Sequence, residues 1–237
     1  MTSRTETSIG QLTLKNPIIA GSGEATMTQG GMRAALEKGA GAVIAKSTNE
    51  SPAARQQLNH TDYMLFDSRW RPIEWTSTPP EDAQLFCRSG LVQEDFDPWL
   101  EKLAALDREA AAMDSYVLGS LILADTEHCV QMAIKMQEAG LRAITVLVAA
   151  VHGDQASHGA IAMVQSVDGV CKVVKSLKSR IDIPIWIKLP GQTEDVSLLA
   201  KAAMDAGASA VSFVDRTMAM VPNLETRAPF FMASNTS

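Results

Sequence analysis

Two lysines stand at the ends of apolar runs that carry no other charge. Lys46 ends the run AVIAK, and Lys188 lies near the end of IPIWIKL. A buried lysine amine is costly unless a partner awaits it. The alternative is an amine that reaches solvent from the end of a strand. The pattern therefore predicts either that the two amines contact a partner or that they extend from the strand ends into solvent.

Small residues follow the first apolar run of the chain. The stretch PIIAGSG places Ala20, Gly21 and Ser22 at its end. Where side chains are this small, a flat group can approach the backbone closely; a tight turn is the alternative reading. GSGEAT has only the first two glycines of the G-x-G-x-x-G fingerprint, so it does not complete a dinucleotide-binding motif.

A histidine is the titratable group nearest to the end of the run AITVLV. His152 follows this run within AAVHGDQ, and the reference pKa of histidine, about 6.5, suits a general acid or base. A loop histidine that faces solvent is the alternative. His152 is therefore the candidate catalytic residue.

Short apolar runs alternate with helical patterns along the chain. The runs are rich in Val and Ile without polar alternation, which is typical of parallel strands buried on both faces. Repeated strand–helix units predict right-handed βαβ crossovers and an α/β fold. An open doubly wound sheet and a (β/α) barrel both fit this pattern. The expected strands are 17–21, 42–46, 116–120, 143–148, 183–189 and 210–214, and the expected helices are 30–38, 97–113, 126–139, 164–179 and 194–206.

The segment 47–96 interrupts this alternation after the second strand. It is long, polar and rich in turn residues, and loops of this length are usually functional covers. The loops after the strands of a barrel form its active face, so we expect this insertion over the C-terminal face of a single domain, 1–237. About six βα units are present, which predicts an incomplete (β/α)8 barrel of the TIM type.

An incomplete barrel leaves two unpaired sheet edges, which are an aggregation hazard unless they are covered. Three explanations are open: the chain is a fragment of a longer relative, a second copy or a partner subunit completes it, or it folds as a rearranged partial barrel. The net charge of −6 and the aromatic content of 5% argue against nucleic-acid binding. Three distant cysteines, a polar N-terminus and no long apolar segment predict a cytoplasmic protein without structural metal or membrane span.

The chain resembles a known family in the order of its motifs. LKNPIIAGSG, GAGAVIAKS, RSGLVQEDFDPW, YVLGSLI, AGLRAITVLVAAVHG and the segment from IPIWIKLPG to SFVDRT are similar to the FMN-dependent dihydroorotate dehydrogenases, including the flavin domain of dihydropyrimidine dehydrogenase. The resemblance extends from about Ile9 to Thr226. Compared with the family, the chain is expected to be truncated at its C-terminus, before the last two strands of the barrel. The resemblance implies a (β/α)8 barrel with FMN at the C-terminal face and a small cyclic substrate.

The resemblance also implies roles for individual residues. Lys188 matches the lysine beside the electron-rich edge of the flavin, where a cation favours the reduced ring. Lys46 and Ser47 match a pair near flavin and substrate. The residues implied in FMN binding are Ala20, Gly21, Ser22, Lys46, Ser47, Ser120 and Lys188.

The run AITVLVAAVH departs from the family pattern. Leu147 falls at the flavin-binding asparagine, Ala150 at the catalytic cysteine and Thr145 at an acidic residue. Alanine cannot act as a base. The leading hypothesis is an FMN-dependent oxidoreductase of a small cyclic substrate, with His152 as acid or base. The alternatives are a catalytically inactive, barrel-like subunit of a larger redox complex, and an aldolase that forms a Schiff base on Lys46 or Lys188.

Overall fold

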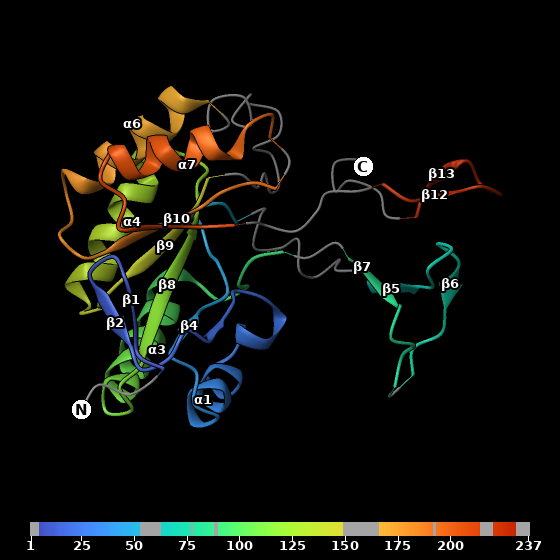
Figure 1. The fold of residues 1–237 in the computed structure, drawn as a ribbon, viewed down its shortest axis with the longest axis horizontal. Helices are drawn as coiled ribbons and strands as arrows, with labels where there is room; N and C mark the ends of the chain where they lie inside the picture. The colour runs from blue at the N-terminus through green and yellow to red at the C-terminus, as the bar shows by residue number, and fades with distance from the viewer. Residues whose placement is uncertain are drawn as a thin grey trace.

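The computed structural model describes residues 5–52, 63–76, 78–87, 90–148, 166–191, 193–213 and 220–230. Six parallel strands form one sheet in the order β11-β10-β9-β8-β4-β3. The sheet curls, and the helices cover its outer face (Figure 1). The predicted α/β class and the incomplete barrel of the TIM type are confirmed. The strands are β3 (Ile19–Ala20), β4 (Ala42–Ile44), β8 (Tyr116–Ile122), β9 (Ile144–Leu147), β10 (Ile185–Lys188) and β11 (Ala210–Ser212).

The helices begin where the sequence offers side-chain caps. The side chains of Asp125, Ser166 and Asp195 accept hydrogen bonds from backbone N–H groups in the first turn of α4, α6 and α7, which satisfies donors that have no partner within the helix. The elements are η1 (Glu24–Thr26), α1 (Gln29–Glu37), α3 (Phe96–Ala111), α4 (Thr126–Glu138), α6 (Val167–Lys178) and α7 (Val196–Asp205).

The two faces of the sheet pack against different partners because successive side chains along a strand alternate in direction. The outer face joins the helices in the main core, to which Val43, Val117 and Val146 belong. The concave face forms a smaller cluster with the hairpin of β1 (Thr7–Ile9) and β2 (Leu12–Leu14). Its members include Leu12, Leu14, Ala42, Leu118, Ala143, Trp186 and Ala210. Because this cluster on the concave face is apolar, polar residues on the same face are candidates for a binding site.

The inserted segment contains a sheet of its own, which the sequence did not predict. Strands β5 (Tyr63–Phe66), β6 (Pro72–Ile73) and β7 (Gln84–Cys87) pair antiparallel in the order β6-β5-β7. Figure 1 shows this sheet extending from the half-barrel, near the hairpin of β12 (Pro222–Asn223) and β13 (Ala228–Pro229). The ring centroids of Phe66 and Phe230 lie 5.8 Å apart, so aromatic packing joins these two small elements.

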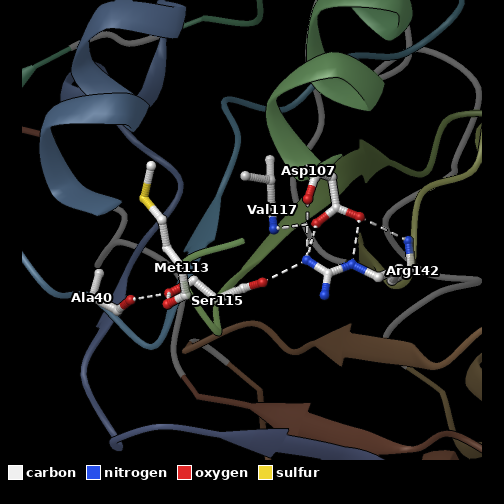
Figure 2. Close-up of polar contacts among 6 residues, drawn as sticks. All are labelled: Ala40, Asp107, Met113, Ser115, Val117 and Arg142. Carbon is white, nitrogen blue, oxygen red and sulfur yellow. Dashed lines mark hydrogen bonds and ion pairs between the residues drawn. The ribbon is translucent and has the colours of Figure 1, made fainter. Parts of the chain in front are cut away.

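A buried ion pair fixes the N-terminal ends of β8 and β9. Asp107 of α3 is 1% exposed, and its carboxylate accepts hydrogen bonds from the Arg142 guanidinium at 2.7 and 2.9 Å and from the Val117 N–H at 2.8 Å. The guanidinium also lies over the ring of Tyr116. Figure 2 shows the contacts of Asp107 with Arg142 and Val117. The ion pair ties α3 to both strands at the end of the sheet opposite the candidate site, where polar residues serve stability in barrels.

Candidate functional site

The two predicted lysines lie at the same rim of the sheet and on the same face. Lys46 follows Ile44 by two residues, and Lys188 follows Trp186 by two, so both share the concave direction of those residues. Strands β8 and β9 lie between β4 and β10, so the lysines do not belong to adjacent strands. Their strands are three spacings apart, at about 4.8 Å each, which is wide enough for a flat ring system.

Three serine hydroxyls from three neighbouring strands form a chain at this rim. The Oγ of Ser22 lies 3.3 Å from the Oγ of Ser47, which lies 2.7 Å from the Oγ of Ser120. Ser47 and Ser120 are buried. The structure thus brings together three residues that the sequence singled out separately. One expectation is corrected: Ser120 lies within β8, two residues before the strand ends at Ile122, because the strand continues further than its apolar run suggested.

The amine of Lys46 has an acidic partner that the sequence reasoning missed. Lys46 is 6% exposed, and its Nζ lies 3.1 Å from the Oε1 of Glu24. Glu24 begins η1, directly beyond the small residues that follow β3. The available signal was the one carboxylate in GSGEAT, combined with the need of a buried cation for an anion.

The small residues at the end of β3 and just after it contribute to the rim in different ways. The side chain of Ala20 packs against the helix-side core, so only its backbone can contribute to the rim. A Cβ added at Gly21 would meet nothing within 4 Å. The backbone of Gly21 therefore borders open space, as a cradle for a flat group requires.

The rim between the two lysines is apolar. Leu147 pairs in register with Ile122 on one side and with Lys188 on the other. Leu147, Ile122 and Leu91 form a separate buried cluster. The position of the family's asparagine is thus part of an apolar layer, and leucine offers no hydrogen bond to a ring.

A row of polar residues lies on the concave face, two residues closer to the N-terminal ends of the strands than Ile122, Leu147 and Lys188. Ser120, Thr145 and Trp186 are in register on β8, β9 and β10. Within the described residues, the Thr145 Oγ1 and the Trp186 Nε1 are buried without a hydrogen-bond partner. Buried polar atoms without partners usually mark an unseen water or ligand. The rim as a whole, with its hydroxyls, its two amines and the open backbone at Gly21, fits a planar heterocycle with hydrogen-bonding edges.

The predicted acid or base cannot be placed in this geometry. His152 and Ala150 lie outside the described residues. In the described part of the chain, no group of three or more His, Cys, Asp or Glu side chains is arranged to hold a metal ion. Within the same ranges, no helix is long and apolar enough to cross a bilayer.

An open hollow of about 660 Å³ lies between η1 and the inserted sheet. It is lined by Glu24, Tyr63, Trp75 and Leu85. The Tyr63 hydroxyl lies 3.2 Å from the Oε1 of Glu24. Burial raises the pKa of Tyr63 to about 12, and the negative charge and hydrogen bond of Glu24 add to this shift. Tyr63 therefore remains a neutral hydrogen-bond donor well above physiological pH.

The fold and the site define a half-barrel of the TIM type with a polar site at the C-terminal rim. No protein-family model matches the sequence. The catalytic subunit of dihydroorotate dehydrogenase B (NAD(+)) from Methanocaldococcus jannaschii is 23% identical over 94% of this chain and 66% of that protein. The same subunit from Thermoplasma acidophilum is 25% identical over 94% and 66%. The chain is thus similar to these dihydroorotate dehydrogenase subunits along most of its length, at 23–25% identity, as its motifs predicted.

The likeness is stronger over a shorter stretch and incomplete in length. The corresponding subunit from Streptococcus pneumoniae is 32% identical over 38% of this chain and 28% of that protein. The chain spans about two thirds of the length of the relatives that it matches along 94% of its own. Among solved structures, the carboxyl transferase domain of Rhizobium etli pyruvate carboxylase aligns over 48% of this chain and 19% of its own, at 18% identity and a TM-score of 0.34.

Proposed function

We propose that this chain is the barrel portion of a flavin-dependent oxidoreductase that transfers a hydride between FMN and a small cyclic substrate. The observation that carries the proposal is the chain of hydroxyls from Ser22 through Ser47 to Ser120, beside the buried amine of Lys46. Lys188 lies on the same face of the same rim. The kinship with dihydroorotate dehydrogenases supports the same reaction class.

The residues of the rim have distinct tasks in this proposal. The open backbone at Gly21 would border the flavin ring, and Ser47 and Ser120 would hydrogen-bond to it. The amines of Lys46 and Lys188 would supply positive charge at its edges. When bound, FMN supplies the capacity to accept or donate a hydride. The apolar layer around Leu147 would keep water away from that part of the site.

The substrate of this site differs from dihydroorotate in our proposal. Leu147 replaces a polar family residue and is packed against Leu91 and Ile122, so the rim favours a less polar ring. His152 is the proposed acid or base, because Ala150 cannot exchange a proton.

A non-catalytic role in a larger redox complex is the second candidate. It is favoured by the burial of Leu147 within an apolar cluster, since a catalytic rim would offer polar groups there. Such a chain would be covered at its edge strands by a second copy or by a partner subunit. Ile18 and Phe213, which adjoin the edge strands β3 and β11, are exposed. A Schiff-base role for Lys46 has less support, because its amine is already paired with Glu24.

The test is the binding of FMN to the purified chain, followed by absorbance and flavin fluorescence. We expect Lys46→Met and Lys188→Met each to weaken FMN binding by about tenfold or more, the equivalent of one lost charge-assisted hydrogen bond. We expect Ser120→Ala to weaken it by about two- to tenfold, the equivalent of one lost neutral hydrogen bond. Lys201→Met is the matched control, because Lys201 is an exposed lysine paired with Asp205 on α7. A parent chain that binds no FMN, or equal affinities for all variants, would refute the proposal.

A further inference from the structure

Glu24 lies at a boundary between the buried rim and the open hollow. Its side chain is 46% exposed, whereas that of its partner Lys46 is 8% exposed. Glu24 also lines the hollow, together with Tyr63, Trp75 and Leu85 of the inserted segment. The Glu24 carboxylate therefore contacts the buried amine of Lys46 and also borders the open hollow.

The short helix that carries Glu24 is hydrogen-bonded to the segment that follows β4 and carries Lys46. The backbone N–H of Lys46 donates to the carbonyl of Thr26 at 3.0 Å. The Thr26 hydroxyl accepts from the Gly23 N–H at 3.0 Å and donates toward the carbonyls of Gly21 and Gly23. Thr26 is 1% exposed. The position of Glu24 is thus set by the same strand end as the amine that it contacts.

A single oxygen of Glu24 contacts two donors from different parts of the chain. Its Oε1 lies 3.1 Å from the Lys46 Nζ and 3.2 Å from the Tyr63 hydroxyl. Lys46 belongs to the rim of the half-barrel, and Tyr63 begins the first strand of the inserted sheet. The two donors lie 17 positions apart in the sequence, and the carboxylate that joins them comes from a third segment.

We propose that Glu24 is the positioning residue of the Lys46 amine, and that Tyr63 links the inserted sheet to it. The inference rests on the proposed function in that Lys46 is taken to contact the flavin. Glu24 holds the ammonium at a fixed place on the concave face, because a buried cation without an anion would turn toward water. Tyr63 docks the inserted sheet on the same oxygen, so displacement of that sheet loosens the constraint on Lys46.

The direct test measures the accessibility of Lys46 without any cofactor. The intact chain is acetylated briefly with an N-hydroxysuccinimide ester, and mass spectrometry gives the labelling rate of Lys46 relative to that of Lys201. We expect Glu24→Ala to raise this ratio at least fivefold. We expect a smaller rise in Glu24→Gln, whose amide oxygen still accepts a hydrogen bond, and in Tyr63→Phe.

Two control variants separate positioning from general loss of structure. Glu127→Ala removes an exposed carboxylate from α4, and Tyr116→Phe removes the other tyrosine hydroxyl of the chain while keeping the ring under Arg142. Both should leave the Lys46 ratio within twofold of the parent. If Glu24→Ala does not fold by circular dichroism, Glu24→Gln is judged alone. An unchanged ratio in the folded Glu24 variants would overturn the proposal.

An FMN titration of the same variants distinguishes the two proposals. We expect FMN to bind about tenfold more weakly to Glu24→Ala, with most of the affinity restored in Glu24→Gln. If the parent binds no FMN, the proposed function fails while the labelling ratio still decides the role of Glu24. If FMN binds equally well to the parent and to Glu24→Ala, the positioning role is wrong and the proposed function stands.

Discussion

Asp107 and Arg142 face each other at one end of the sheet as a two-point ion pair, with N–O distances of 2.7 and 2.9 Å. They lie at the end of β8 and β9 opposite to Lys46 and Ser120. The pair ties α3 to the N-terminal ends of both strands. It therefore lies at the opposite end of these strands from the candidate site.

We expect Asp107→Ala to lower the free energy of unfolding by about 3 kcal/mol, since it leaves a partly buried guanidinium and the Val117 N–H without their acceptor. Urea denaturation followed by circular dichroism measures the change. Glu109→Ala on the same helix is the control, because the pair of Glu109 with Arg33 is exposed and should contribute less than about 1 kcal/mol. Equal effects of the two substitutions would contradict the structural role of Asp107.

The chain of serine hydroxyls predicts an order of effects. Ser47→Ala removes the shared partner of Ser22 and Ser120, whereas Ser120→Ala leaves Ser47 bonded to Ser22. We therefore expect Ser47→Ala to be the more destabilising, by about 1–3 kcal/mol. The double variant should be less destabilised than the sum of the two, because the two hydroxyls contact each other. Strict additivity in urea denaturation would show that they do not interact.

Leu147 tests whether the apolar layer at the rim is structural. Leu147→Ala should lower the free energy of unfolding by about 2–4 kcal/mol, because it opens a cavity beside Leu91 and Ile122. Leu147→Asn introduces the amide that the family has at this position and leaves it without a partner in the cluster, so we expect at least the same loss. A folded Leu147→Asn variant that gains FMN affinity without losing stability would instead place this position in direct contact with the cofactor.

The three cysteines should differ in reactivity. Burial raises the pKa of Cys129 to about 12, with smaller contributions from the charges of Glu50 and Asp125. At pH 8 it is therefore a neutral thiol, and only the thiolate reacts with thiol reagents. Cys87 and Cys171 are partly exposed and should react in the native chain with Ellman's reagent, while Cys129 reacts after denaturation. In Cys129→Ala, the two thiols that react in the native chain should remain, and the third thiol that reacts after denaturation should be absent.

The raised pKa of Tyr63 predicts an effect of alkaline pH on the inserted sheet. The pKa lies at about 12 in the folded chain against 10.0 for the free side chain, so the proton is held more tightly in the folded state. The contribution of Tyr63 to stability is present below pH 10 and is lost between about pH 10 and pH 12. Absorbance at about 295 nm reports the phenolate. Tyr63→Phe should remove the late part of this titration, and Tyr116→Phe should leave it in place.

The sequence determined the architecture and several residues of the rim. Hydrophobic runs and caps such as Asp125 are local signals, and they gave the alternating strands and helices and the parallel sheet. The same signals put Lys46 and Lys188 at strand ends, because a charge is conspicuous within an apolar run. The motif order predicted the relationship to dihydroorotate dehydrogenases, which the comparisons confirm.

The tertiary structure alone decided which side chains meet. The partnership of Glu24 with Lys46 and Tyr63, and the chain from Ser22 to Ser120, join segments far apart in sequence. The inserted sheet of β5–β7 was also missed, since its short strands are embedded in polar, turn-rich sequence. The physical reason is that periodicity reports which face of an element is buried, whereas contacts between elements depend on strand order and register, which pattern alone does not specify.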